Sequence, residues 1–283
     1  MVSIIILSYN TKDLLTSCLD SIKNHLHKGD FEIIVVDNAS SDDTSLMIKK
    51  EFKEVMLIES KENLGYAKGM NLGVSKAKGE YLLLLNSDTK LKDDILPLFL
   101  NNYSTFEKLA VIGPRLENSL GNNDGSYGSF YTIFSVFYLL FGSHFVSNKN
   151  EASHKARYVD WVSGGCMFIK RELYDQNNGF DPRLFMYGED VEFCYRLHKK
   201  GFNVLYDPSI VVFHVGQGSS NRSFAIIQIY KGILYFFRKH KPKWQYALIY
   251  FMLKSKAIIL LSIGKMYNNE YLIHTYGQAL AIS

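Results

Sequence analysis

Unbroken apolar runs alternate with stretches of helical spacing along the first part of the chain. Runs typical of buried strands occur at Val2–Ser8, Phe31–Asp37, Val55–Glu59, Tyr81–Leu85 and Ala110–Gly113. Apolar residues between the first two runs repeat at the spacing of a helix: Leu14, Leu15, Cys18, Leu19, Ile22 and Leu26. Asp42-Asp43-Thr44 is expected to open a second helix, with acids in its first turn. This β-α-β-α-β order predicts an α/β fold with a mostly parallel, doubly wound sheet.

The pattern changes after residue 150. Further strands are expected at Gly165–Lys170, Phe202–Asp207 and Ile210–Val215, with a helix at Glu189–Lys200. From Asn221 onward the spacing is helical, and Pro242 interrupts it. The chain therefore divides into a domain over residues 1–220 and a helical tail over residues 221–283.

Polar side chains follow three of the predicted strands directly: Ser8-Tyr9-Asn10, Asp37-Asn38-Ala39-Ser40-Ser41 and Asn86-Ser87-Asp88. The carboxyl ends of parallel strands share one edge of a sheet, so these groups are expected to converge on one site. No GxGxxG or Walker lysine follows the first strand, which argues against dinucleotide and P-loop sites there. Asp37 could accept the N3–H of a pyrimidine, and Asp88 could hold a divalent metal against a diphosphate. Alternatively, both merely cap the turns or helices that follow.

Charge is divided unevenly along the 283 residues, of which 47% are hydrophobic and 21% charged. The net +4 separates into −4 over residues 1–220 and +8 over residues 221–283. This division excludes a uniformly basic nucleic-acid binder and favours an anionic surface as a partner of the tail. The three scattered cysteines show no metal spacing or disulfide framework, which favours a reducing compartment. The N-terminus is interpreted as a strand, not a signal peptide.

Two apolar stretches raise the question of a membrane. Gly125–Asn148 is uncharged, but its dense part, Tyr131–Val146, is short for a spanning helix. Trp244–Ile263 contains nine Leu, Ile or Phe, worth about −3 to −5 kcal/mol on an insertion scale. Lys254 and Lys256 cost about 5–7 kcal/mol on the same scale. Packing on the domain or lying in the membrane interface is therefore favoured over spanning.

A basic cluster, Arg238, Lys239, Lys241 and Lys243, precedes Trp244, Tyr246 and Tyr250. Cations beside interfacial aromatics suit an anionic lipid surface. The expected location is cytoplasmic, peripheral on the inner face of the cell membrane. Lys254 and Lys256, about 200° apart on a helix, should interrupt its apolar face. A helical lid with solvated lysines, or a contact in a homo-oligomer, remains an alternative.

The ordered motifs resemble glycosyltransferase family 2. They are Val2–Asn10, Val35–Asp42, Asn63-Leu64-Gly65, Asn71-Leu72-Gly73, Leu85-Asn86-Ser87-Asp88 and Gly164–Ile169. The run from Gly179-Phe180-Asp181 through Phe185–Glu192 is similar to the rhamnosyltransferase-like branch. The resemblance covers roughly residues 1–240. It implies a GT-A fold with a Rossmann-like mixed sheet, a nucleotide-diphosphate sugar donor carrying dTDP or UDP, Mn²⁺ or Mg²⁺, and inversion at the anomeric carbon.

The resemblance also implies roles for individual residues. Asp37 would read the base, Asp88 would bind the metal, and His214 would face the metal or the diphosphate. The donor-binding set would comprise Ser8, Tyr9, Asn10, Asp37, Asn38, Asn63, Gly65, Lys68, Asn86, Ser87, Gly164 and Gly165. Asn86 departs from the aspartate found in many members, which could lower the metal affinity. Lys68 and the two glycines have structural alternatives: a solvated helix lysine and a tight turn.

Asp190 would be the catalytic base, because an acceptor hydroxyl attacks poorly until its proton is removed. Its neighbour Glu189, assigned to the acceptor side, could raise the pKa of Asp190 by like-charge repulsion. Adjacent residues at a helix start point in different directions, so one base is expected. Alternatively, these acids only complement the helix dipole. Trp161 could stack on an acceptor sugar or belong to the core.

The sequence thus predicts an inverting, metal-dependent glycosyltransferase. The expected reaction moves L-rhamnose from dTDP-rhamnose onto a glycan or polyprenyl-linked glycan in surface-polysaccharide synthesis. A UDP-hexose donor is an alternative that Asp37 does not distinguish. A non-catalytic sugar-nucleotide or glycan-binding module would have a broken site, yet Asp37, Asp88, Asp190 and His214 are present. A nucleotidyltransferase would need a Gly-rich, Arg-containing loop after Leu7, which is missing.

Overall fold

The computed structural model describes residues 1–26, 31–123, 125–141, 155–216 and 221–282, and it divides into two compact units. The sheet unit comprises Met1–Ser129, His154–Phe185 and Glu189–Ser219. The helical unit comprises Phe130–Ser153, Met186–Gly188 and Ser220–Ser283. Two short segments that the sequence analysis assigned to the first domain therefore group with the tail.

A nine-stranded mixed sheet forms the centre of the sheet unit. The strands of its main path, in spatial order, are β3 (Met56–Glu59), β2 (Phe31–Asp37), β1 (Val2–Ser8), β4 (Tyr81–Asn86), β10 (Cys166–Lys170), β6 (Leu109–Glu117), β11 (Asn203–His214) and β5 (Thr89–Leu91). The strands from β3 to β4 are parallel, and β10 lies antiparallel between β4 and β6. β8 (Arg157–Val159) pairs with β11, while β7 (Tyr127–Gly128) and β9 (Trp161–Val162) form a separate ribbon. The predicted doubly wound mixed sheet is confirmed.

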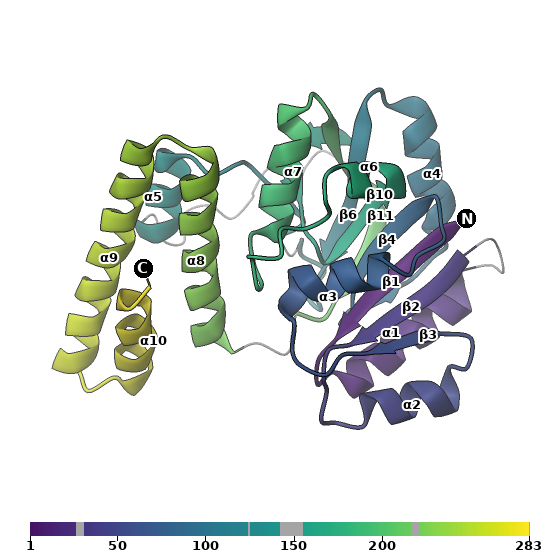
Figure 1. Cartoon of the computed structure of the whole chain (residues 1–283), viewed down its shortest axis with the longest axis horizontal. Coiled ribbons are helices and arrows are strands. Elements are labelled where there is room, and N and C mark those ends of the chain that lie inside the picture. The colour runs from purple at the N-terminus through teal and green to yellow at the C-terminus, as the bar shows by residue number, and fades with distance from the viewer. Residues whose placement is uncertain (27–30, 124, 142–154, 217–220, 283) are drawn as a thin grey trace. The chain divides into compact units, whose positions relative to one another are not determined.

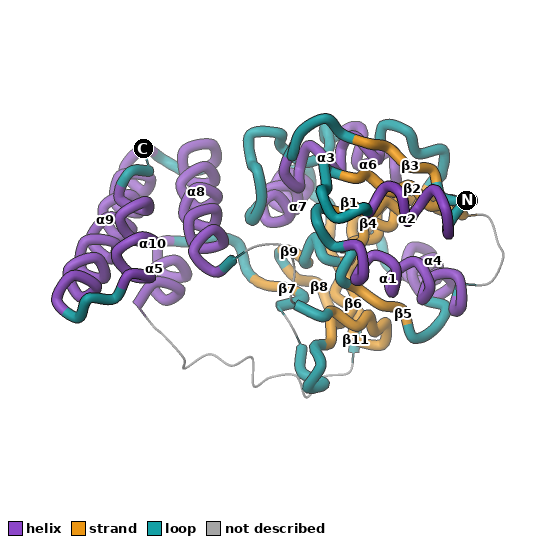
Figure 2. The backbone as a smooth tube through the Cα atoms, turned by 90° about the horizontal axis from the view of Figure 1, so that it is seen from below, coloured by secondary structure: helices purple, strands orange, loops and turns teal. Residues whose placement is uncertain are grey.

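Helices cover both faces of this sheet (Figures 1 and 2). They are α1 (Lys12–His25), α2 (Thr44–Glu51), α3 (Gly65–Val74), α4 (Leu96–Thr105), α6 (Arg171–Gln176) and α7 (Glu189–Lys199). Ile4 and Ile6 belong to one core with apolar residues of α1, α2 and α4. Ile5 faces α3, where a Cβ on Gly73 would lie only 2.4 Å from it. Because β1 is buried on both sides, its apolar run is unbroken.

Two of the differences from the sequence prediction concern α2 and β11. α2 begins at Thr44, so Asp42 and Asp43 precede its first turn, where Asp42 accepts the N–H groups of Lys12 at 2.9 Å and Thr44 at 3.3 Å. The strands expected at Phe202–Asp207 and Ile210–Val215 are one strand, β11. Its register shifts between Asp207 and Val211, where the Asp207 carboxylate accepts the backbone N–H and the hydroxyl of Ser209. A local irregularity within one strand had the sequence pattern of a loop.

The three cysteines, Cys18, Cys166 and Cys194, are free thiols buried in the sheet unit. Burial raises the pKa of Cys18 to about 12 and also raises the pKa of the other two. These thiols therefore stay protonated near neutral pH, and they behave as small core residues.

The helical unit consists of four described helices: α5 (Ile133–Phe141), α8 (Arg222–His240), α9 (Lys243–Met266) and α10 (Glu270–Leu280). Pro242 stands at the N-cap of α9, which confirms the predicted interruption. By length and composition α9 is the one described helix that could cross a membrane; the mean hydropathy of its best window is 1.7, and 28% of that window is buried.

Lys254 and Lys256 of α9 bind the carboxyl ends of neighbouring helices. The ammonium group of Lys254 donates to the carbonyl of Leu280 in α10. That of Lys256 donates to the carbonyl of Leu140 in α5, and partial burial lowers the pKa of Lys256. A cation at a helix C-terminus satisfies orphan carbonyls and complements the helix dipole.

This arrangement leaves a continuous apolar face on α9. Its exposed large apolar side chains are Trp244, Leu248, Phe251, Ile258, Ile259 and Met266. Among the described residues of α9, exposed charges occur only at the two ends, at Lys243 and Lys265. α5 adds exposed Phe134, Phe137 and Leu139 and carries no charge. The expectation that Lys254 and Lys256 interrupt the apolar face is wrong, because both bind carbonyls within the unit.

Candidate active site

The polar ends of β1, β2 and β4 meet at one edge of the sheet. In the parallel register Ser8 lies beside Asp37, and Leu7 lies beside Asn86. A buried chain of hydroxyl groups joins Ser8 to Thr11 at 2.8 Å and Thr11 to Ser87 at 2.9 Å. The predicted convergence of these strand ends is therefore present in the structure.

Asp37 is buried, and its carboxylate organises the turn that leads to α2. One oxygen accepts the N–H of Ser40 at 3.0 Å, and the other accepts the hydroxyl of Ser45. This is the capping role that the sequence left open, and base recognition by Asp37 stays a prediction. Asn10 ties the same turn to β1, because its amide oxygen accepts the N–H of Ser41 at 2.7 Å. Tyr9, which lies between Ser8 and Asn10 in the sequence, is half-buried.

Asn38 and Asn63 connect the end of β2 to the start of α3. The amide of Asn38 donates to Asn63 Oδ1 at 2.9 Å, and that oxygen also accepts the N–H of Gly65 at 3.0 Å. Gly65 has φ +76°, and a Cβ there would lie 2.4 Å from the carbonyl of Phe185. The Asn-Leu-Gly motif therefore positions backbone, while Lys68 is exposed on α3.

Asp88 and His214 come together although they lie far apart in sequence. β5 pairs antiparallel with the end of β11, which places His214 opposite Thr89, and Asp88 Oδ1 lies 3.3 Å from His214 Nε2. Within the described residues, no group of three or more His, Cys, Asp or Glu is placed to hold a metal. Two side chains, one oxygen and one nitrogen donor, fit an ion that completes its coordination with substrate phosphates. Gln217, Gly218 and Ser219 of the predicted motif lie outside the described residues.

The turn Gly164–Gly165 connects the two halves of the candidate site. The carbonyl of Gly165 accepts the N–H of Asn86 at 3.0 Å. The N–H of Gly164 donates to Asp190 Oδ2 at 3.1 Å, and its carbonyl accepts the hydroxyl of Tyr66 at 2.5 Å. This turn therefore holds the Asn86–Asp88 segment and Asp190 within one network.

Glu189 and Asp190 begin α7 and share a desolvated environment. Burial, and then the charge of Asp190, raise the pKa of Glu189 to about 8. Within the described part of the chain, Glu189 Oε2 has no hydrogen-bond partner. Burial also raises the pKa of Asp190, but the N–H groups of Gly164 and Val191 oppose this by donating to its carboxylate. Repulsion by Glu189 was the expected cause of a raised pKa at Asp190; burial is instead the largest cause, and the like-charge repulsion raises the pKa of Glu189.

Trp161 packs within the small β7–β9 ribbon. Its ring lies against Gly128, where a Cβ would be 2.4 Å from Cζ2, and its indole N–H donates to the Ser129 carbonyl at 3.0 Å. These contacts favour the packing alternative, and sugar stacking by Trp161 stays a prediction.

Sequence reasoning missed Tyr66 and Thr11. Tyr66 directly follows the Asn63-Leu64-Gly65 motif. This position next to a motif was the only sequence feature that could have indicated that Tyr66 belongs to the site. Thr11 is the residue after Asn10, and it bridges Ser8 and Ser87. A hydroxyl side chain just beyond a motif has many alternative roles, so only the contacts identify these two residues.

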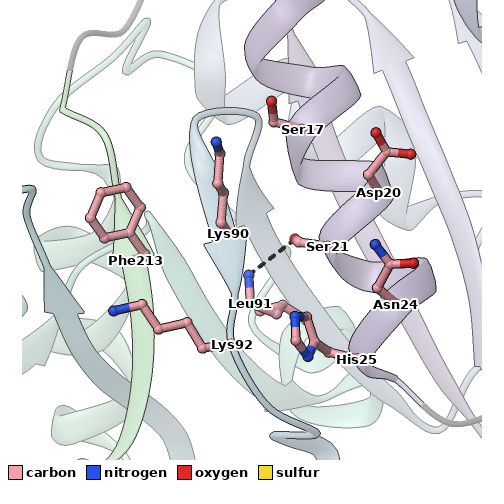
Figure 3. Close-up of a pocket in the computed structure, with 9 residues that line it drawn as sticks. All are labelled: Ser17, Asp20, Ser21, Asn24, His25, Lys90, Leu91, Lys92 and Phe213. Atoms are coloured by element: carbon pink, nitrogen blue, oxygen red, sulfur yellow. Dashed lines mark hydrogen bonds between the residues drawn. The ribbon is translucent and has the colours of Figure 1, made fainter.

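A pocket of about 470 Å³ lies between α1 and the edge formed by β5 and β11 (Figure 3). Lys90, Lys92 and Phe213 line one side, and Ser21 of α1 accepts the N–H of Leu91 at 3.0 Å. None of the predicted donor, metal or catalytic residues lines this pocket. The candidate site is therefore the network around Gly164–Gly165.

Solved structures similar to this chain have the GT-A fold. GalNAc-T7, crystallised with UDP, GalNAc and Mn²⁺, matches with a TM-score of 0.66 at 17% identity, over 91% of this chain and 50% of its own. The mannosyltransferase PcManGT of Pyrobaculum calidifontis, in complex with GDP-Man and Mn²⁺, matches with a TM-score of 0.59 at 17% identity, over 99% and 85%. At these identities the likeness establishes the fold, which is GT-A.

Sequence comparison establishes the family. Residues 3–177 match the family model of glycosyl transferase family 2. The chain therefore belongs to glycosyltransferase family 2. It is 28% identical to the low-salt glycan biosynthesis hexosyltransferase Agl10 of Haloferax volcanii, over 71% of this chain and 63% of that protein.

Two further relatives are named as rhamnosyltransferases. The N-acetylglucosaminyl-diphospho-decaprenol L-rhamnosyltransferase of Mycobacterium tuberculosis is 25% identical, over 67% of this chain and 68% of its own length. Rhamnosyltransferase WbbL of Escherichia coli is 27% identical, over 79% and 86%. The resemblance to the rhamnosyltransferase-like branch is thus confirmed at modest identity.

Proposed function

We propose that this protein is an inverting, metal-dependent glycosyltransferase that moves L-rhamnose from dTDP-rhamnose onto a glycan or lipid-linked glycan. The observation that carries the proposal is the Gly164–Gly165 turn, which joins the strand end of Asn86 to the half-buried Asp190 carboxylate. A site for the donor diphosphate and a base for the acceptor thus share one backbone element.

Asp88 and His214 are the proposed metal-binding residues. A divalent ion held there supplies positive charge that offsets the negative charge gathering on the leaving diphosphate. The imidazole nitrogen of His214 favours Mn²⁺ over Mg²⁺. Mn²⁺ in the complexes of GalNAc-T7 and PcManGT supports this choice.

Asp190 is the proposed general base. Two like-charged carboxyl groups in a desolvated site hold one proton between them near neutral pH. Asp190 receives two backbone N–H groups and Glu189 Oε2 none in the described structure, so Asp190 is the ionised member. It takes the proton of the acceptor hydroxyl while the new C1–O bond forms. The bond from C1 to the phosphate oxygen breaks on the opposite face, which inverts the anomeric carbon.

Relatives named as rhamnosyltransferases support dTDP-rhamnose as the donor. The complexes with UDP or GDP-Man keep another nucleotide sugar, such as a UDP-hexose, as the second candidate. The decaprenol-linked acceptor in the name of the mycobacterial relative supports a polyprenyl-linked acceptor here.

The helical unit is proposed to dock on an anionic membrane at the inner face, where the lipid chain of a polyprenyl-linked acceptor would be anchored. The apolar face of α9 and α5 suits the acyl boundary, and Lys243 and Lys265 at its ends suit anionic headgroups. A second copy fits this surface less well, because each helical tail carries nine Lys or Arg and a single acid.

A thermal-shift screen of nucleotide sugars tests the donor proposal. dTDP-rhamnose should raise the melting temperature in Mn²⁺ and fail to do so with a chelator. A UDP-hexose that alone raises it would select the second candidate. No response to any nucleotide sugar would overturn the donor site.

Flotation with anionic vesicles at low salt tests the docking proposal. The protein should float, and Phe251→Asp should lower the bound fraction several-fold through loss of apolar burial. Leu46→Asp, at an exposed apolar position of the sheet unit, is the matched control and should float like wild type. Equal loss in both variants, or no flotation of wild type, would contradict docking through α9.

A further inference from the structure

The backbone just before the two carboxylates belongs to the helical unit. Met186–Gly188 groups with α5, α8, α9 and α10, whereas Glu189 and Asp190 follow at once in the sheet unit. Tyr187 and Gly188 have φ +66° and φ +97°, so two consecutive residues are left-handed. The start of α7 therefore follows a turn with an uncommon backbone conformation, and few other conformations would keep the same chain direction.

Gly232 of α8 provides the space in which this turn lies. A Cβ on Gly232 would be 2.5 Å from the Tyr187 carbonyl oxygen and 3.8 Å from Gly188 Cα. The first distance is well inside van der Waals contact, and the obstructing atom is backbone, which cannot rotate away as a side chain can. Ala in place of Gly232 would therefore have to move either the turn or α8.

The position of Gly232 runs against local helix propensity. α8 spans Arg222–His240, so Gly232 lies in its interior, where glycine destabilises a helix relative to alanine. Gly277 of α10 shows the contrasting case, because a Cβ there would meet nothing within 4 Å. Close approach of the Tyr187 carbonyl is the physical reason for glycine at position 232.

The other end of the same loop is fixed within the sheet unit. The carbonyl of Phe185 accepts the N–H of Tyr66 at 2.6 Å. Tyr66 in turn donates to the carbonyl of Gly164, whose N–H binds Asp190. With Phe185 held in this way, a displacement of the Tyr187 carbonyl is transmitted along the chain toward Glu189 and Asp190.

We propose that Gly232 is a positioning residue for glycosyl transfer: by admitting the Tyr187–Gly188 turn against α8, it sets where the Asp190 carboxylate stands relative to the acceptor hydroxyl. The inference rests on the proposed role of Asp190 as the base. It gives the helical unit a part in the chemical step that is separate from membrane docking.

The primary test compares Gly232→Ala with Gly277→Ala, the same substitution in two helices of one unit. Gly232→Ala should lower kcat about tenfold or more, since small misplacements of a catalytic group can cost about 100-fold. Donor affinity, measured by calorimetry with Mn²⁺, should stay within about twofold of wild type, because Asp88 and His214 are not affected. Gly277→Ala should keep wild-type kcat. A Gly232→Ala enzyme with wild-type kcat would overturn the proposal.

Hydrogen–deuterium exchange gives a readout that does not depend on activity. In Gly232→Ala, amides of residues 186–191 should exchange faster, while those of β1 and β4 keep their protection. Unchanged exchange at residues 186–191 would overturn the proposal.

If Gly232→Ala also unfolds α8, Gly188→Ala provides the second variant, because it strains the same turn at φ +97° without altering α8. It should show the same loss of kcat with intact donor binding, and wild-type kcat would overturn the proposal. Asp190→Asn separates the two levels of inference. If Asp190→Asn is inactive while the turn variants keep wild-type kcat, only positioning by Gly232 fails. If Asp190→Asn stays active, the assigned base itself is wrong.

Discussion

The sheet unit and the helical unit both withdraw charged side chains from water, with opposite consequences. In the sheet unit, Glu189 lacks a partner for Oε2 within the described structure, and its pKa rises. In the helical unit, Lys254 and Lys256 bind helix-terminal carbonyls, which clears the exposed face of α9. A carboxyl group that is buried without a hydrogen-bond partner takes up a proton. A lysine whose ammonium group binds a carbonyl inside the unit keeps its charge, and the surface that it leaves becomes apolar.

Asp190→Asn should give the largest effect. Removing a general base typically costs about 100- to 10,000-fold in rate, so transfer should fall in that range. Donor binding should be nearly intact, because the metal and diphosphate contacts are assigned elsewhere. Transfer assays with calorimetry on the same sample measure both. Turnover above about a tenth of wild type would refute the base assignment.

Asp88→Ala should affect binding where Asp190→Asn affects rate. Loss of a metal-binding carboxylate should weaken Mn²⁺-dependent donor affinity by about 100-fold. Residues that only hydrogen-bond to metal ligands typically cost about 10- to 100-fold, so the loss of a ligand itself should be at least as large. Calorimetry with Mn²⁺ and with chelator measures it. The exposed Asp93→Ala is the control and should bind donor like wild type. Equal affinity of Asp88→Ala and wild type in Mn²⁺ would exclude Asp88 as a ligand.

Glu189→Gln should change how stability depends on pH. With a folded pKa of about 8 against 4.5 unfolded, wild-type Glu189 keeps a proton in the folded state that the unfolded chain has released. Its stabilising contribution is complete below pH 4.5 and is lost as the pH rises through 8. Denaturation by urea should therefore show wild type losing about 2 kcal/mol relative to Glu189→Gln between pH 6 and pH 8. Parallel pH curves would mean that Glu189 is ionised in the fold.

The smallest effects should separate the two kinds of lysine in the helical unit. Lys256→Met removes the donor to Leu140 and should cost about 1 kcal/mol of stability, with little change in vesicle binding. Lys243→Met should do the reverse: stability stays within about 0.5 kcal/mol, while vesicle affinity falls several-fold. Identical behaviour of the two variants would remove the distinction between inward and surface lysines.

Much of the sheet unit could be predicted because strand ends are local features. Val2–Ser8 and Phe31–Asp37 are each one unbroken apolar run ending in a polar residue, so their bounds match the structure. The contact of Asp88 with His214 depends on pairing between β5 and β11, for which only the family resemblance gave a signal. The link from Gly164 to Asp190 depends on β10 entering antiparallel between β4 and β6, which periodicity does not encode.

The helical unit was less predictable, because side-chain direction on α9 is a tertiary property. A helical wheel places Lys254 and Lys256 about 200° apart, but it says nothing of carbonyls supplied by Leu140 and Leu280. Flexible four-carbon stems let both ammonium groups reach helix ends that only the fold provides. The sequence also placed residues 130–141 in the other domain, since α5 has no charge pattern that assigns it to the tail.

Burial of the three cysteines makes the surface of this protein selectively labelable. Cys18, Cys166 and Cys194 are protonated and inaccessible in the fold, so maleimide and methanethiosulfonate reagents should leave them unmodified. Cysteines introduced at exposed Asp93 and Lys265 would then take a pair of spin labels without any background substitution. Pulsed dipolar spectroscopy on that pair would report the distance between the two units as donor, metal and vesicles are added.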